Sequence, residues 1–219
     1  MGPRAVVAAV PVAAAEQLTE LEAFAREVAG CTRCRLAEGR TQVVFGVGNA
    51  HADLMFIGEA PGFHEDKQGE PFVGAAGQLL TKLLGDIGLR RQDVYIANVL
   101  KCRPPGNRDP MPDEIDSCKP WLKEQLDLID PRIIATLGNF STQLLLGKKT
   151  GISKVRGQRF EWRGRMLIPT FHPAAILRSG SAGLAMQQIE QDFLLIRKTL
   201  DEAPLASAED PSEQLGLFQ

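Results

Sequence analysis

The sequence predicts a three-layer α/β/α domain with a central, mostly parallel four-stranded sheet. Short apolar runs of strand type alternate along the chain with longer segments whose apolar residues recur at helical spacing. This alternation is typical of a parallel sheet whose two faces are covered by helices. With 219 residues, 44% of them hydrophobic, the chain is long enough for one well-buried domain.

Four short apolar runs are predicted to form the buried strands. They span residues 53–57, 93–99, 132–137 and 166–168. A shorter segment, residues 160–162, is expected to form a β-ribbon with residues 165–168 around the Arg163-Gly164 turn.

Five segments of helical periodicity precede, separate or follow these runs. They span residues 17–29, 75–87, 113–128, 139–146 and 182–200. Pro112 stands at the start of the third segment and Gly147 directly after the fourth, which are the positions where these residues favour helix ends.

The two ends of the chain differ in composition from the middle, so a single domain is expected over residues 17–200. Residues 1–16 are expected to be a poorly ordered extension, because a single Arg4 and an interrupting Pro11 disfavour a signal peptide. Residues 201–219 contain acidic residues but no Lys or Arg, which is typical of a flexible tail.

Hydropathy excludes a membrane-spanning protein, whereas charge alone decides nothing. The formal net charge of −2 permits nucleic-acid binding through a local basic face but is far from the strongly basic footprint of many nucleic-acid binders. No apolar run approaches the length that spans a bilayer. We therefore expect a soluble, monomeric cytoplasmic protein without a membrane partner.

Four cysteines indicate a metal centre. They lie as a close pair, Cys31-x2-Cys34, followed much later by Cys102 and Cys118. Disulfides are rare in cytoplasmic proteins, so the four thiols are expected to bind one shared metal centre. A zinc ribbon normally repeats the close pair, whereas the second pair here is widely spaced. Spacing alone leaves structural zinc and a [4Fe-4S] cluster open.

Polar and small residues gather at the carboxyl ends of the predicted strands, where ligands bind in open parallel sheets. A carboxylate, an amide and an imidazole are therefore expected to meet at one edge of the sheet. The segments concerned are Gly58-Glu59-Ala60-Pro61-Gly62, Asn98, Gly138-Asn139 and Phe171-His172-Pro173.

Several motifs occur together. They are GEAPGxxED at residues 58–66, GxPFVGxAGQLL at 69–80, NVLKCRPPGNR at 98–108 and HPAA at 172–175. With the four cysteines, they make residues 18–200 resemble the type-4 uracil-DNA glycosylases, the iron–sulfur branch of the uracil-DNA glycosylase superfamily.

This resemblance implies a monofunctional enzyme that flips uracil out of DNA and hydrolyses its N-glycosidic bond. The product would be an abasic site, the first intermediate of base excision repair, made by a nucleoid-associated protein. It also implies a mainly structural [4Fe-4S] cluster bound by Cys31, Cys34, Cys102 and Cys118.

The chemistry of the reaction suggests roles for the matching residues. Phe72 would stack on the flipped base, a contact of about 1 to 3 kcal/mol. The Asn98 amide offers a donor for uracil O4 and an acceptor for N3–H, a pair that cytosine would mismatch. His172 would donate a hydrogen bond to O2 of the leaving uracil. The full substrate-binding set is Gly58, Glu59, Ala60, Phe72, Asn98 and His172.

The residue that activates the water is less directly indicated. The best-known branch of the superfamily carries an Asp where this chain has Ala60. Glu59 is expected to position the water, with Glu65 as the second candidate. Alternatively, the water needs little help because the sugar cation forms first.

Contacts to the DNA are predicted on both sides of these motifs. Ile176 or Leu177 matches a loop that wedges into the gap left by the flipped base, and one of the two is expected to be a core residue instead. Four basic residues are candidate phosphate contacts, although each could equally be a solvated surface charge. They are Lys101, Arg103, Arg108 and Arg178.

The tail carries a candidate binding peptide for the bacterial sliding clamp. Its sequence is Gln214-Leu215-Gly216-Leu217-Phe218. It resembles the short peptide by which repair and replication proteins dock on the clamp, with Leu217 and Phe218 filling an apolar pocket. Tethering would raise the concentration of the protein near newly made DNA.

Two other functions stay open on the residues alone. One is a non-turnover uracil-DNA binding protein that traps the sugar through a histidine in an inserted Arg-rich loop. Residues 101–114 contain neither the insertion nor a histidine, which favours catalysis. The other is an iron–sulfur interaction domain, which would form no abasic product.

Overall fold

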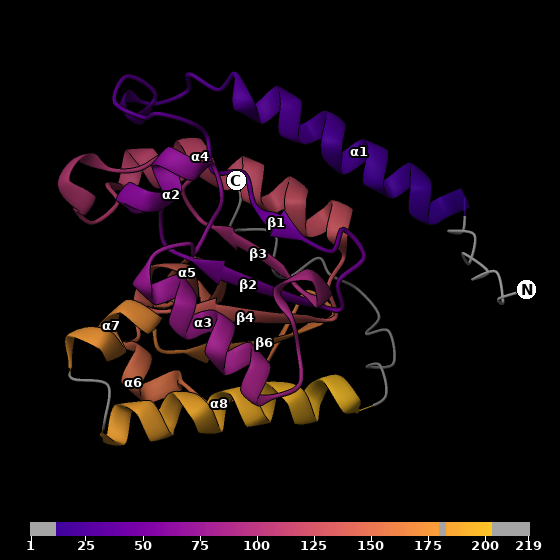
Figure 1. The fold of residues 1–219 in the computed structure, drawn as a ribbon, viewed down its shortest axis with the longest axis vertical. Helices are drawn as coiled ribbons and strands as arrows, with labels where there is room; N and C mark the ends of the chain where they lie inside the picture. Colours follow the sequence, from indigo (N-terminus) through magenta and orange to yellow (C-terminus); the bar gives the residue numbers. More distant parts are fainter. Residues whose placement is uncertain (1–11, 180–182, 203–219) are drawn as a thin grey trace, which may run out of the picture.

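The computed structural model describes residues 12–179 and 183–202, which form a sheet covered by helices on both faces (Figure 1). The α/β/α class is therefore confirmed, but the sheet has six strands rather than four, in the order β1-β3-β2-β4-β6-β5. The strands are β1 Val47–Gly48, β2 Leu54–Gly58, β3 Tyr95–Asn98, β4 Ile133–Leu137, β5 Phe160–Trp162 and β6 Arg165–Thr170.

The four predicted strands form the parallel centre of this sheet, and the two further strands lie antiparallel at its edges. β5 is the predicted ribbon strand. It pairs with β6 through a two-residue turn in which Arg163 has φ 50° and Gly164 has φ 72°. Left-handed backbone at both turn residues is the geometry that suits the twist of a tight hairpin.

The predicted helices are all present, with ends that shift by a few residues. Helix α1 begins at Val12, five residues before the predicted start of this helix. Helices α2, α6 and α7 were not predicted, because each has six residues or fewer and shows little periodicity. The helices are α1 Val12–Ala29, α2 Phe63–Gln68, α3 Ala75–Asp86, α4 Pro112–Ile129, α5 Asn139–Leu146, α6 Ile152–Val155, α7 Pro173–Arg178 and α8 Leu184–Asp201, and the short 3-10 helices are Arg35–Ala37, Arg91–Asp93 and Pro105–Asn107.

Successive side chains of each central strand enter two separate cores. Along β2, Met55 and Ile57 face the core beneath α1, α4 and α5, whereas Leu54 and Phe56 face the core beneath α3, α7 and α8. In Figure 1, α1 and α4 lie above the sheet and α3 and α8 below it. Burial on both faces explains why these strands read as continuous apolar runs.

Strand β2 lies between β3 and β4. The chain leaves β2 toward β3 on one side of the sheet, and it leaves the neighbouring β4 toward β6 on the other side. This is the position at which open α/β sheets form a ligand crevice. Gly58 at the end of β2 is directly paired with Asn98 at the end of β3. The sheet register thus places two of the predicted site residues side by side.

None of the helices in the described part of the chain combines the length and the apolar character needed to cross a membrane. The candidate clamp peptide, residues 214–218, lies outside the described residues.

Candidate active site

A cleft of about 500 Å³ opens at the carboxyl ends of the central strands. Its walls come from the segments that follow β2, β3, β4 and β6, which are far apart in the sequence. The structure therefore brings most of the predicted site residues to one place. Those that line the cleft are Glu59, Ala60, Glu65, Phe72, Asn98, Arg108, His172 and Arg178.

Gly58 makes the floor of the cleft possible. A Cβ atom at this position would lie 2.4 Å from Asn98 Oδ1 and 2.6 Å from Phe72 Cζ. Gly77 on α3 has a similar role, because its Cβ would lie 1.7 Å from the Phe72 carbonyl oxygen. Helix α3 thus packs directly against the backbone of Phe72, which has the unusual φ of 55°. The Phe72 ring lies against Gly58, and the residue is 6% exposed.

Asn98 carries a buried acceptor without a partner. Its side chain is 2% exposed, and Oδ1 makes no hydrogen bond to any described residue. A buried polar atom left in this state costs about 1 to 3 kcal/mol of stability. Such an atom in the floor of a cleft is best explained as an acceptor kept for a ligand donor.

His172 presents a fixed donor to the same cleft. Its Nδ1 accepts a hydrogen bond from the Ala174 amide at 3.2 Å, so the ring proton of the neutral form resides on Nε2. Burial lowers the pKa of His172 to about 4; the Arg178 charge lowers it further, and Glu65 opposes the shift. The ring lies 5.5 Å from that of Phe72, centroid to centroid. At neutral pH, His172 is therefore an uncharged N–H donor.

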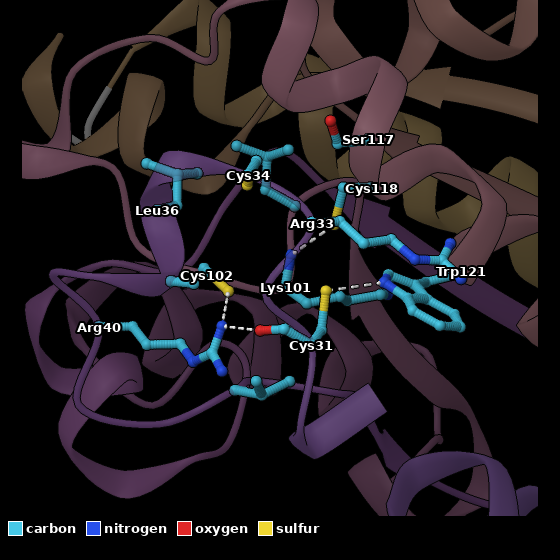
Figure 2. Close-up of a pocket in the computed structure, with 13 residues that line it drawn as sticks. Cys31, Arg33, Cys34, Leu36, Arg40, Lys101, Cys102, Ser117, Cys118 and Trp121 are labelled. Carbon is cyan, nitrogen blue, oxygen red and sulfur yellow. Dashed lines mark hydrogen bonds between the residues drawn. The ribbon is translucent and has the colours of Figure 1, made fainter. Parts of the chain in front are cut away.

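The four cysteines line a second cavity (Figure 2), and none of them is in a disulfide. Their sulfur atoms surround one space in Figure 2. Three N–H groups point at these sulfurs: Trp121 Nε1 to Cys31 at 3.3 Å, the Lys101 amide to Cys118 at 3.2 Å, and Arg40 Nη1 to Cys102 at 3.4 Å. Within the described residues, no three His, Cys, Asp or Glu side chains are grouped as for a single bound ion.

The model of the Uracil DNA glycosylase superfamily matches residues 45–194. The chain is 46% identical over 190 residues to the type-4 uracil-DNA glycosylase of Sulfurisphaera tokodaii, covering 83% of this chain and 85% of that relative. The corresponding enzyme of Archaeoglobus fulgidus is 48% identical over 168 residues, 73% of this chain and 84% of the relative. That of Thermotoga maritima is 46% identical over 183 residues, 81% and 95% respectively. The chain belongs to the type-4 uracil-DNA glycosylase family.

As a member of this family, the protein is a DNA glycosylase, a hydrolase of N-glycosidic bonds that binds uracil-containing DNA. Two of the carboxylates that line the cleft, Glu59 and Glu65, have different surroundings. Burial raises the pKa of Glu59 to about 7, the Asp109 carboxylate adds to this shift, and Arg178 opposes it. Glu65 instead uses Oε1 to accept hydrogen bonds from the amides of Val73 and Gly74, both at 2.9 Å. Glu65 therefore anchors the loop that carries Phe72.

The predicted wedge of the glycosylase is narrowed to one residue. Ile176 is 2% exposed and packs in the core beneath α3, α7 and α8, so it is the core residue expected for one of the pair and not the wedge. Leu177 is 37% exposed on the same helix and stays the candidate. Arg178 follows it and lines the cleft.

Two predicted phosphate contacts have partners within the protein. Arg103 Nε donates to Asn107 Oδ1 at 2.7 Å. Arg108 forms two hydrogen bonds with the buried carboxylate of Glu114, at 2.9 and 2.5 Å. The charge of Arg108 is thus largely compensated, although its side chain borders the cleft.

The assignment of Lys101 as a phosphate contact is wrong. Its side chain is 1% exposed, and Nζ donates to the Asn98 carbonyl oxygen at 2.8 Å and to Gln125 Oε1. Burial lowers the pKa of Lys101 to about 8, and Cys118 opposes this shift. The chain turns inward between β3 and Cys102, which buries the lysine side chain.

Sequence reasoning missed two further residues that shape the glycosylase site. Asp109 contributes to the raised pKa of Glu59, and no motif marked it. A signal for Gln125 existed, because it is a polar residue among the buried apolar positions of α4.

Proposed function

We propose that this glycosylase is monofunctional: it removes uracil from DNA, leaves the sugar–phosphate strand intact and so begins base excision repair. The observation that supports this most directly is the partnerless Oδ1 of Asn98, which lies beside Phe72 and His172 in one cleft. No lysine is among the described residues that line this cleft. Strand cleavage by an amine nucleophile that attacks the sugar is therefore not expected.

Recognition begins with extrusion of the nucleotide, which costs a few kcal/mol of lost stacking and pairing. Phe72 stacks on the extruded base and returns about 1 to 3 kcal/mol of this cost, for any base. Asn98 then discriminates, because Oδ1 accepts from N3–H and Nδ2 donates to O4. Cytosine presents an acceptor at N3 and a donor at N4, so both contacts would fail.

Cleavage moves the electron pair of the glycosidic bond onto the departing uracil, where O2 carries much of the negative charge. The Nε2–H of His172 donates to O2 and stabilises this charge as it develops. The sugar becomes cationic at C1′ and is captured by water, which loses a proton in forming the hydroxyl of the abasic site. Because His172 is neutral, it acts through a hydrogen bond and does not transfer a proton.

The overall proposal is tested with protein purified without oxygen and matched oligonucleotides containing U, T or hypoxanthine. We expect release of free uracil and a strand that breaks only after alkali or heat. A strand break before alkali treatment would overturn the monofunctional assignment, and no base release from any substrate would overturn the proposed reaction.

Glu59 is proposed to position the attacking water when its carboxylate is ionised. The pKa of about 7 predicts that kcat/KM rises with pH through this value and then levels. A single hydrogen bond to the water is worth about 1 kcal/mol, so Glu59→Gln should lose only about five- to tenfold in rate and flatten the profile. Single-turnover rates between pH 5 and 9 measure both effects.

Glu65→Gln is the matched control, because a glutamine oxygen still accepts from the Val73 and Gly74 amides. It should keep the pH profile of the native enzyme. A flattened pH profile in Glu65→Gln together with a normal profile in Glu59→Gln would show that Glu65, and not Glu59, positions the water. Normal rates in both variants would show that the water needs no carboxylate.

The side chains of the cysteine cavity support a [4Fe-4S] cluster. Four thiols around one space supply the ligand set, and the N–H groups at three of the sulfurs suit thiolates that carry negative charge. Cys31, Cys34, Cys102 and Cys118 would hold the cluster, which would join the first helix to the segment that follows β3. When bound, it supplies cross-linking of these loops rather than a chemical step.

Cys118→Ala should therefore lose the broad visible absorption of the cluster and lower the thermal midpoint of the protein. Burial raises the pKa of the Cys118 thiol to about 11, and the Lys101 charge opposes this shift. The measurements are iron content, visible absorption and thermal melting. Full absorption and stability in Cys118→Ala, or stoichiometric zinc in the native protein, would contradict the assignment.

Two partners complete the proposal. Leu177 and Arg178 would contact DNA beside the extruded base, and the enzyme would act as a monomer. The peptide at residues 214–218 would bind the sliding clamp, so deleting residues 213–219 should abolish clamp binding while leaving uracil release from short oligonucleotides unchanged. Equal clamp binding by the native and shortened chains would remove this partner.

A further inference from the structure

Lys101 is a buried cation whose described partners are all uncharged. Its ammonium contacts the carbonyl oxygen of Asn98 and the side-chain oxygen of Gln125, and no described carboxylate forms an ion pair with it. A buried charge without a countercharge is strongly unfavourable. Gln125 is held in place, because it is fully buried and its Nε2 donates a hydrogen bond to the Phe45 carbonyl oxygen.

The same residue also borders the cysteine cavity (Figure 2). Its backbone amide donates to Cys118 Sγ at 3.2 Å, and the next residue is Cys102. Four thiolates around a [4Fe-4S] cluster carry a net negative charge, so a cluster here would give the Lys101 ammonium its missing countercharge.

The segment between Asn98 and the cysteines has little freedom. The Val99 amide donates to the Gly58 carbonyl, and the Leu100 amide donates to the Glu59 carbonyl, both at 3.0 Å. Lys101 links the two ends of this segment, because its amide donates to Cys118 Sγ and its ammonium donates to the Asn98 carbonyl oxygen. A shift at the cysteine cavity is therefore transmitted to the end of β3, where the uracil-reading amide begins.

We propose that Lys101 is a positioning residue that couples the cysteine-bound cluster to uracil recognition by fixing the backbone of Asn98. This inference rests on the proposed function, since it assumes that Asn98 reads uracil and that the thiols hold a cluster. It assigns the cluster a second role, in which its negative charge holds the ammonium that aligns Asn98.

The test uses Lys101→Met in the complete chain, with the cluster loaded. Methionine has a similar length but no donor and no charge. Affinity is measured with an oligonucleotide containing 2′-fluoro-deoxyuridine, whose glycosidic bond resists cleavage. We expect Kd to rise about tenfold, which corresponds to the loss of about 1.4 kcal/mol. We also expect the reduction potential of the cluster to become more negative, because a nearby positive charge has been removed.

A double-mutant cycle separates positioning from a general loss of stability. If Lys101 acts through Asn98, adding Lys101→Met to Asn98→Leu should change Kd by less than twofold. The single variant Lys101→Met should still melt at a lower temperature than the native protein, and the double variant at a lower temperature than Asn98→Leu. An equal tenfold rise in both backgrounds would overturn the proposal.

Lys123→Met is the matched control, because Lys123 lies on the exposed side of α4 and forms a surface ion pair with Asp127. It should leave Kd and potential unchanged. If Lys101→Met does not fold, Gln125→Glu decides in the same assays. Its new carboxylate should draw the ammonium from the Asn98 carbonyl and raise Kd similarly, and an unchanged Kd would overturn the proposal. Uracil release by the native enzyme alongside such a result would leave the proposed function standing.

Discussion

His172→Ala should slow uracil release by about 10²- to 10³-fold, the range observed when one donor to a developing oxyanion is removed. The reason is that O2 gains negative charge only as the glycosidic bond breaks, so the Nε2–H contact is stronger in the transition state than in the bound substrate. Single-turnover rates at saturating protein measure this loss directly. Binding of the 2′-fluoro-deoxyuridine oligonucleotide should change far less than the rate.

The pH dependence gives this prediction a second signature. A pKa of about 4 keeps His172 neutral from pH 5 upward, so the native enzyme should show no loss of rate that reports imidazole deprotonation near pH 6.5. His51→Ala is the control, since His51 is exposed before the amino-terminal end of β2, at the opposite edge of the sheet. Equal losses of binding and rate in His172→Ala would instead show a contact made equally in both states.

The layered fold could be predicted because each central strand is buried on both faces and each long helix has an apolar stripe. Such patterns depend only on local spacing. The edge strand β1 has two residues and pairs with β3 across a gap of more than forty residues. No local pattern marks a strand this short, so the count of strands was wrong while the parallel centre was right.

The sequence predicted which strand ends form the site, but it did not predict which partners the side chains near the site would contact. Glu59, Asn98 and His172 line one cleft because the carboxyl ends of neighbouring parallel strands share one edge. Whether a basic residue near that edge faces DNA or the interior depends on the path of the loop, which periodicity does not describe. Lys101 was therefore assigned to the surface and is in fact buried, and the choice between Ile176 and Leu177 as the exposed residue stayed open.

The rigidity of the pocket also follows from tertiary contacts alone. The positive φ of Phe72 is maintained by the close approach of Gly77 and by the Glu65 carboxylate, which bonds to the next two amides. A backbone held in this way keeps the aromatic ring in place before the base arrives, so less ordering is needed during binding.

Asn98→Leu should destroy activity and at the same time stabilise the protein. Leucine has nearly the same shape but neither hydrogen-bonding atom, so the two contacts to the uracil edge are lost. At about 1 to 2 kcal/mol for each contact, kcat/KM should fall by roughly 30- to 10³-fold and discrimination against cytosine should disappear. In the free protein, however, Oδ1 is buried without a partner, and its removal should raise the free energy of unfolding by about 1 to 3 kcal/mol.

Denaturant unfolding of the two proteins measures this gain, and Thr136→Val supplies the matched comparison. Thr136 is equally buried at the end of β4, but its hydroxyl is bonded to that of Thr142 at 2.8 Å. Its replacement should lower stability, because it leaves the Thr142 hydroxyl without this partner. Opposite signs for the two variants would show that Asn98 is kept for its ligand at the expense of the fold. If Asn98→Leu is instead less stable than the native protein, the amide supports the scaffold, and the uracil-reading role would need another residue.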